Sequence, residues 1–201
     1  TIFKSWFVDF DGQTEFEDSE LGQIPKGWQV GTFSDVINEI ESGRRPKGGI
    51  NSSDTEVPSI GAENIIGLGQ YNYSKTKYIS LEFFNEMKTG KIKDNDVLLY
   101  KDGASLGRKS LFRNGFPFKQ CCINEHVFIS RPNKKISPPF LFFWLDQDFM
   151  EENVQNLNNI MFLDRTLSGL FSSINIISLF SSFISVFVIL SNSSSIIHSS
   201  I

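Results

Sequence analysis

Two short motifs contain residue types that could catalyse a reaction. Residues 103–107 (GASLG) match the G-x-S-x-G pattern of a hydrolase nucleophile elbow, which holds its serine, here Ser105, on a sharp turn between a strand and a helix. The residues after the motif have a strand-like pattern ended by Asn114-Gly115, which is not the pattern of a helix. We therefore expect a glycine-rich turn between two strands, with a serine hydrolase as an alternative.

The second motif, residues 86–88 (EMK), has the E-x-K spacing of a metal-dependent nuclease centre, which needs clustered carboxylates to hold Mg²⁺. It falls in a predicted short helix, where residues two apart do not share a face, so we expect a solvated helix surface instead. With only His126 and His198, a centre built from several histidines is not expected. Cys121 and Cys122 are adjacent, which argues against a disulfide framework or spaced zinc ligands and favours a reducing, cytoplasmic compartment.

The composition excludes several classes of protein. The chain has 201 residues, of which 40% are apolar, and a formal net charge of −4, so it can bury a core and is not typical of a disordered protein. It has no P-loop, no G-x-G-x-x-G and no Asn/Asp-Pro-Pro-aromatic run, so neither ATP hydrolysis nor base methylation is indicated. It starts at Thr1 without an initiator methionine or a signal peptide, and we expect a fragment of a longer protein.

Basic residues are concentrated in the middle of the chain. Residues 42–120 contain 13 Lys and Arg against 8 Asp and Glu, a net charge of +5, whereas residues 1–41 carry −7 and residues 121–201 carry −2. Such asymmetry indicates a polyanionic partner. Arginine pairs bidentately with guanine and lysine mostly contacts phosphates, so basic loops suit DNA. The basic residues fall in or beside three loops: Arg44, Arg45 and Lys47; Lys101, Arg108 and Lys109; Arg113 and Lys119. The alternative is a set of ordinary solvated charges balanced by nearby aspartates.

Hydrophobic spacing and capping residues predict four helices. Apolar residues three and four apart in 1–10 form one helical stripe, as in the last turns of a longer helix. Ser34 and Ser80 are suited to cap short helices over 35–41 and 81–88, respectively. An amphipathic helix is expected to begin at Pro138-Pro139 and to continue to about residue 157.

Short strands are predicted between these helices. They fall in 28–33, 57–80, 96–116 and 121–131, with glycine-rich turns and a loop over 43–54. There is no repeated βαβ rhythm. The expected fold class is therefore α+β, with short, mostly antiparallel strands and a few helices.

The C-terminal region differs sharply in composition from the rest. Residues 166–201 contain no Asp, Glu, Lys or Arg, and the uncharged stretch 169–190 is long enough to be a transmembrane candidate. Three interpretations are open: a membrane anchor, a soluble segment, or an artefact such as out-of-frame translation. The first would make the chain a membrane-anchored interaction module.

Several motifs, in this order, resemble the specificity subunit of type I restriction–modification systems. TIFKSWFVDFD resembles the end of the conserved helix that joins two target-recognition domains, and SELGQIPKGW resembles the opening of the second such domain. The resemblance continues through SGRRPKG, VPSIGAENI, KIKDNDVLLYKDGASLGRKSLF and ISPPFLFFWL, up to about residue 157. The implied organisation is the end of a spacer helix (1–12), a linker (13–20), a target-recognition domain (21–158) and an atypical tail (159–201).

The resemblance implies a non-catalytic subunit that reads one half of a split target in double-stranded DNA. It also implies partners: methyltransferase subunits, restriction subunits and a second specificity half-subunit. S-adenosylmethionine, ATP and Mg²⁺ would be held by those partners, with no cofactor on this chain and no membrane favoured. The candidate DNA contacts are Arg44, Arg45, Lys47, Asn64, Lys101, Arg108, Lys109, Lys119 and Gln120.

Overall fold

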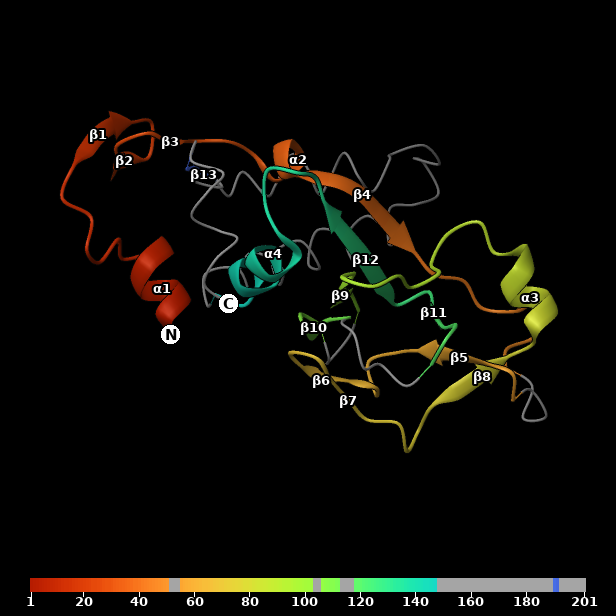
Figure 1. Ribbon diagram of the computed structural model, residues 1–201. Coiled ribbons are helices and arrows are strands. Elements are labelled where there is room, and N and C mark those ends of the chain that lie inside the picture. Colours follow the sequence, from red (N-terminus) through yellow and green to blue (C-terminus); the bar gives the residue numbers. More distant parts are fainter. Residues whose placement is uncertain (51–54, 103–105, 113–117, 148–189, 192–201) are drawn as a thin grey trace, which may run out of the picture.

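The computed structural model describes residues 1–50, 55–102, 106–112, 118–147 and 190–191. Its main sheet has the strand order β10-β9-β12-β4, with every neighbouring pair antiparallel (Figure 1). Its strands are β4 (Ile37–Ser42), β9 (Val97–Tyr100), β10 (Lys109–Leu111) and β12 (Val127–Pro132). A second sheet has the order β11-β5-β8, in which β11 is parallel and β8 antiparallel to β5. Its strands are β5 (Val57–Ile60), β8 (Lys77–Ile79) and β11 (Cys122–Ile123).

Three two-stranded pairs and four short helices complete the described fold. The pairs are β1 (Phe16–Ser19) with β2 (Gly22–Pro25), β3 (Trp28–Gln29) with β13 (Leu190–Ser191), and β6 (Ile65–Gly67) with β7 (Gln70–Tyr71). The helices are α1 (Ile2–Phe7), α2 (Phe33–Val36), α3 (Leu81–Glu86) and α4 (Pro138–Leu145). The predicted fold class is confirmed: the chain is a mixed α+β protein of short, mostly antiparallel strands.

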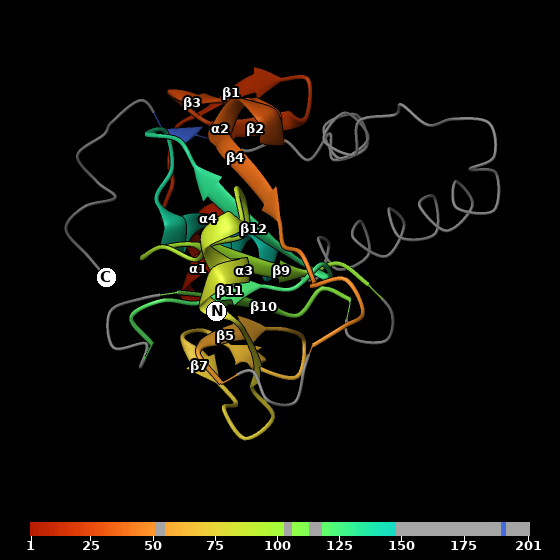
Figure 2. The ribbon, with the colours of Figure 1, turned by 90° about the vertical axis from the view of Figure 1, so that its right-hand side faces the viewer.

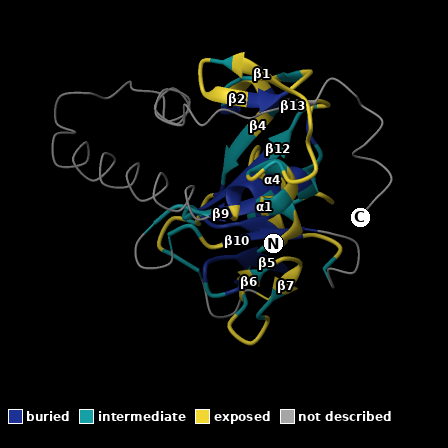
Figure 3. Cartoon of the chain, turned by 90° about the vertical axis from the view of Figure 1, so that its left-hand side faces the viewer, coloured by how far each residue is buried: buried dark blue, intermediate teal, exposed yellow. Residues whose placement is uncertain are grey.

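The main sheet is covered on both faces. Successive strand residues point to opposite faces, so Val97 of β9 packs with Leu141 of α4, while Leu98 packs with Ile60 and Ile123 of the second sheet. All five side chains are fully buried. Figure 3 shows this burial in α4, β9, β10 and β5, in contrast to the mostly exposed strand β1.

The helical stripe predicted for residues 1–10 is shorter than expected and is covered on one side. α1 ends at Phe7, and the rings of Phe3 and Phe7 lie 5.1 and 5.2 Å from the ring of Phe140 in α4. Ile2 and Trp6 remain 72% and 52% exposed. One apolar face of α1 therefore packs within this chain, and the other is left on the surface.

Residues 37–42 form a strand, so the helix predicted for 35–41 is wrong. α2 ends at Val36 and is capped by Thr32 rather than by Ser34. The reason is tertiary: β4 pairs with β12, and its acidic side chains meet Arg131 of that strand. These contacts outweigh a weak local preference for helix.

Other predicted elements differ in detail. The acidic segment 13–20, expected to be a linker, contains strand β1. Residues 121–131 contain two strands that join different sheets. α4 is buried nearly all round because α1 covers the side away from the sheet, so over its described length it is not amphipathic. The helix starts at Leu81 and Pro138 and the strands of 57–80 are confirmed, but α3 ends at Glu86 and α4 at Leu145, before the predicted ends. The strand predicted for 28–33 covers only Trp28–Gln29, because Phe33 begins α2.

Among the described residues, no helix is long and apolar enough to cross a membrane. The stretch 169–190 lies outside the described residues except for Leu190, and so does Ser105 of the G-x-S-x-G motif.

Candidate nucleic-acid interface

Three strands of the main sheet bring separate loops together at one edge. Ser42, at the end of β4, is paired with Phe128, and Tyr100, at the end of β9, is paired with Val127 at the start of β12. The backbone N–H of Lys101 then donates to the carbonyl of His126 at 2.9 Å. The loop after β4, the turn after β9 and the segment before β12 therefore leave the sheet side by side. Figure 2, seen from the side of α3, shows β4 beside β12.

This arrangement collects five of the predicted DNA contacts on one surface, which we call the basic edge. Its members are Arg44, Arg45, Lys47, Lys101 and Arg108. Among them, only Lys101 is partly buried, while the others are exposed. They come from two segments more than 50 residues apart in the sequence, so the sheet register is what places them together.

Each arginine of the loop after β4 has its own neighbour. The Arg44 guanidinium carbon lies 5.7 Å from the ring centroid of Phe83 in α3, in cation–π geometry. Arg45 Nη2 lies 2.9 Å from Glu125 Oε1. Both side chains thus have preferred positions on the surface.

Lys101 and Arg108 are also held by defined contacts. Lys101 Nζ donates to Ser42 Oγ at 2.9 Å and lies 4.2 Å from the ring centroid of Phe128. Arg108 Nη1 donates to the carbonyl of Ala62 at 3.3 Å. The basic edge is therefore connected to the second sheet through the turn that follows β5.

Two predicted contacts face the interior. Lys109 is buried, with its Nζ 3.3 Å from an oxygen of Asp146 at the end of α4, because it shares a face of β10 with the core residue Leu111. Asn64 is fully buried: its Oδ1 accepts from the N–H of Gly61 at 2.9 Å and its Nδ2 donates to the carbonyl of Asn72 at 2.8 Å. In this conformation both residues support the fold and are not presented to DNA.

Lys119 and Gln120 are exposed but lie apart from the basic edge. They lead into the start of β11, whereas Glu125 follows the end of that strand. The neighbouring Phe118 ring packs on Tyr73, 5.5 Å between centroids. Arg113 lies outside the described residues.

Asp102, Glu125 and His126 also lie at the basic edge and contact one another, which the sequence did not predict. His126 Nδ1 lies 2.6 Å from Asp102 Oδ2, and His126 Nε2 lies 3.2 Å from Glu125 Oε1, the oxygen that also meets Arg45. The only sequence signal was the adjacency of Asp102 to a basic residue and of Glu125 to His126. The pairing of β9 with β12 brings Asp102, which follows β9, close to His126, which precedes β12.

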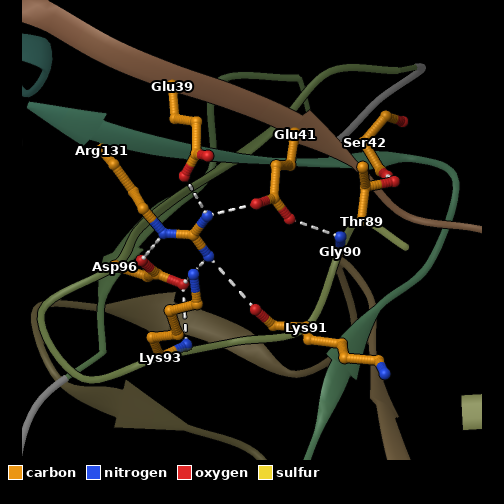
Figure 4. A network of polar contacts seen from close by, with 9 residues as sticks. All are labelled: Glu39, Glu41, Ser42, Thr89, Gly90, Lys91, Lys93, Asp96 and Arg131. Carbon is orange, nitrogen blue, oxygen red and sulfur yellow. Dashed lines mark hydrogen bonds and ion pairs between the residues drawn. The ribbon is translucent and has the colours of Figure 1, made fainter. Parts of the chain in front are cut away.

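A polar network centred on Arg131 fixes the strand from which the basic loop leaves (Figure 4). Arg131 Nε and Nη2 donate to the two oxygens of Asp96 at 2.6 and 2.8 Å, and Nη1 donates to Glu39 at 2.7 Å and also to Glu41. Nη2 further donates to the carbonyl of Lys91 at 3.2 Å. The guanidinium thereby joins β4, β12 and the segment before β9.

The same network reaches the start of the basic loop. Glu41 accepts from the backbone N–H of Gly90 at 2.6 Å, and Thr89 Oγ1 donates to the carbonyl of Ser42 at 3.1 Å. Gly90 has φ +81°, and a Cβ at this position would lie 2.8 Å from the Cα of Gly43. Two glycines in close contact therefore set the point at which the chain turns from β4 into the loop.

Burial and hydrogen bonding shift the pKa values of several described side chains. Burial raises the pKa of the Cys122 thiol to about 11 and also raises that of Cys121, so both thiols stay protonated near neutral pH. The hydrogen bond from Arg131 lowers the pKa of the exposed Glu39 carboxyl. No group of His, Cys, Asp and Glu in the described part of the chain is arranged to hold a metal ion.

Comparison with known proteins finds similarity to curated proteins and to solved structures. No family model matches the chain. It is 28% identical over 138 residues to the "Type I restriction enzyme MjaIX specificity subunit" of Methanocaldococcus jannaschii, covering 64% of this chain and 30% of the relative. The alignment therefore spans less than a third of that protein.

Two solved structures share the fold. The HsdS subunit of Thermoanaerobacter tengcongensis aligns with 88% of this chain and 36% of its own, at a TM-score of 0.53 and 16% identity. A structure described as the "structural basis underlying complex assembly and conformational transition of the type I R-M system" aligns with 94% of this chain and 39% of its own, at a TM-score of 0.54 and 18% identity.

Proposed function

We propose, from its similarity in sequence and fold to type I restriction–modification specificity subunits, that this chain reads one half of a split target in double-stranded DNA. The observation that carries the proposal is the basic edge, where the register of the main sheet gathers arginines and lysines from separate loops. In this proposal the chain binds DNA without catalysing a reaction on it.

The chemistry of the basic edge suits duplex DNA better than a small anion. Arginines on a loop can enter the major groove and pair bidentately with guanine, while lysines fix the register on the phosphates. Lys47 and Arg108 are exposed, and within the described ranges Arg108 uses one of its five donors, on the carbonyl of Ala62. The basic edge can therefore supply both positioning contacts and base contacts.

The partners are proposed on the same basis. Methyltransferase and restriction subunits would hold S-adenosylmethionine, ATP and Mg²⁺, and this chain would hold none of them. The exposed side of α1, with Ile2 and Trp6, offers an apolar surface for such a subunit or for a second half-subunit. Lys119 and Gln120 remain candidate DNA contacts outside the basic edge.

The proposal is tested by selecting bound sequences from random DNA duplexes with the full chain at about 0.15 M salt. We expect enrichment of one short, asymmetric motif, because a single recognition domain reads one half-site. A triple variant with alanine at Arg44, Arg45 and Arg108 should lose the enrichment. The matched control removes three charges elsewhere, at Lys26, Lys134 and Lys135, and should keep it. Recovery of unenriched DNA by the wild type would contradict the proposal.

A further inference from the structure

Two adjacent arginines on the basic edge differ in their electrostatic surroundings. Arg44 packs over the ring of Phe83, and no carboxylate among the described residues forms an ion pair with it. Arg45 forms an ion pair with Glu125, in which both side chains are partly exposed, at 39% and 34%. Among the described residues, no carboxylate therefore offsets the positive charge of Arg44, whereas Glu125 offsets that of Arg45.

The carboxylate that meets Arg45 also faces His126, which forms an ion pair with it when the imidazole is protonated. Glu125 Oε1 lies 3.2 Å from His126 Nε2, and His126 Nδ1 lies 2.6 Å from Asp102. The N–H of His126 also donates to Asn124 Oδ1 at 2.9 Å, which fixes the backbone that carries both residues. Glu63, the other carboxylate near Arg45, is engaged with Lys77 at 2.8 Å. Arg45 therefore rests against one anchored acceptor.

The two surroundings favour different contacts with DNA. A phosphate contact depends on net positive charge, which a carboxylate partner cancels. Reading guanine depends on the direction of the guanidinium fork, and an anchored carboxylate reduces the rotamer freedom lost on binding. Arg45 uses one donor on Glu125 and keeps the others for a base edge.

We infer that Glu125 is a positioning residue that orients Arg45 to read a guanine, while Arg44 contacts a phosphate. The inference rests on the proposed DNA-binding function and adds to it a division of roles between the two arginines. His126 and Asp102 act through Glu125 by holding its carboxylate.

The test measures the affinity of the full chain for the duplex enriched by selection and for every single-base variant of it. Glu125→Gln keeps the size of the side chain but removes its charge. We expect it to reduce discrimination at one G·C pair by about tenfold, with little loss of affinity for unrelated duplexes. Arg45→Ala should lose about 5- to 150-fold discrimination at the same pair, and Glu125→Gln should add nothing in that background.

Two further variants keep the test decisive. Arg44→Ala should weaken binding to all duplexes alike and flatten the salt dependence. Arg45→Lys retains the positive charge but lacks the planar guanidinium, so it should lose discrimination at the same G·C pair. This variant keeps the inference testable if Glu125→Gln fails to fold. Glu15→Gln, which removes the partner of Lys26 at a distant exposed pair, is the matched control and should change nothing.

Uniform weakening, or unchanged discrimination, in Glu125→Gln and Arg45→Lys would overturn the inference while specific binding by the wild type stands. Equal binding of the wild type to every duplex would instead overturn the proposed function.

Discussion

At the scale of single residues, Arg131 connects β4, β12 and the segment before β9 through its guanidinium. Its side chain is 13% exposed, and that of its bidentate partner Asp96 is 2% exposed. A buried ion pair of this kind contributes modestly to stability when intact, but removal of one partner leaves an uncompensated buried charge. Because the same guanidinium also holds both acidic residues of β4, its loss should loosen the strand beneath the basic edge.

We expect Arg131→Met to lower the free energy of unfolding by about 3–5 kcal/mol, measured by urea denaturation. The control is Lys26→Met, which breaks an exposed pair with Glu15 and should cost no more than about 1 kcal/mol. A loss below about 1 kcal/mol for Arg131→Met would show that the network does not support the fold.

Glu39 gives a pH-dependent prediction. The hydrogen bond from Arg131 lowers its pKa in the folded state below the ordinary value of 4.5, so the stabilisation is present above that value and is lost as the pH falls through the folded-state pKa. Because Glu39 is half exposed, Glu39→Gln should be less stable than the wild type by only about 0.2–1 kcal/mol near neutral pH. Denaturation curves from pH 7 to 3 should converge; a constant difference would contradict this.

The sequence predicted which segments carry the basic residues, but not which way every side chain faces. Arg44, Arg45 and Arg108 are exposed as predicted. Lys109 has the same chemistry as these residues, but strand alternation turns it toward α4, and this depends on a register that the sequence does not state. The group around His126 was missed because its members meet only through strand pairing.

At the scale of elements, glycine contacts set the departure of the basic loop from β4. A Cβ on Gly43 would lie 2.0 Å from the carbonyl oxygen of Ile123, which is backbone and cannot turn aside. The loop over 43–54 was predicted from its composition, but the need for glycine at position 43 arises from the second sheet. Similarly, β4 was predicted to be helix from its local capping pattern. Its pairing with β12 joins residues such as Glu41 and Arg131, which are 90 positions apart, so the local sequence does not indicate it.

Gly43→Ala should therefore destabilise the chain by about 1–3 kcal/mol, because the backbone must shift to admit the methyl group. Thermal unfolding followed by circular dichroism would measure the effect. Gly67→Ala is the control, since a Cβ there meets open space, and its unfolding temperature should change little or rise slightly. Equal stability of the Gly43→Ala variant and the wild type would contradict the packing described at the base of the loop.

At the scale of the whole molecule, the net charge of −4 conceals the feature that bears most directly on function. The excess of basic residues in 42–120 is divided by the fold: part of it lies on the basic edge, and part forms internal pairs such as that of Lys109 with Asp146. The fold class and the basic loops were predictable from composition and turn residues. The pairing of β11 with β5 in a second sheet, which brings the Ala62 turn to Arg108, was not.

The central claim is sequence-specific binding of duplex DNA, and fluorescence anisotropy with the full chain tests it most directly. The titration compares the duplex enriched by selection with a scrambled duplex of the same base composition at about 0.15 M salt. We expect a Kd at least about tenfold lower for the selected duplex, because base edges are read. Equal Kd values for the two duplexes would contradict it, because attraction between basic residues and phosphates alone does not depend on sequence.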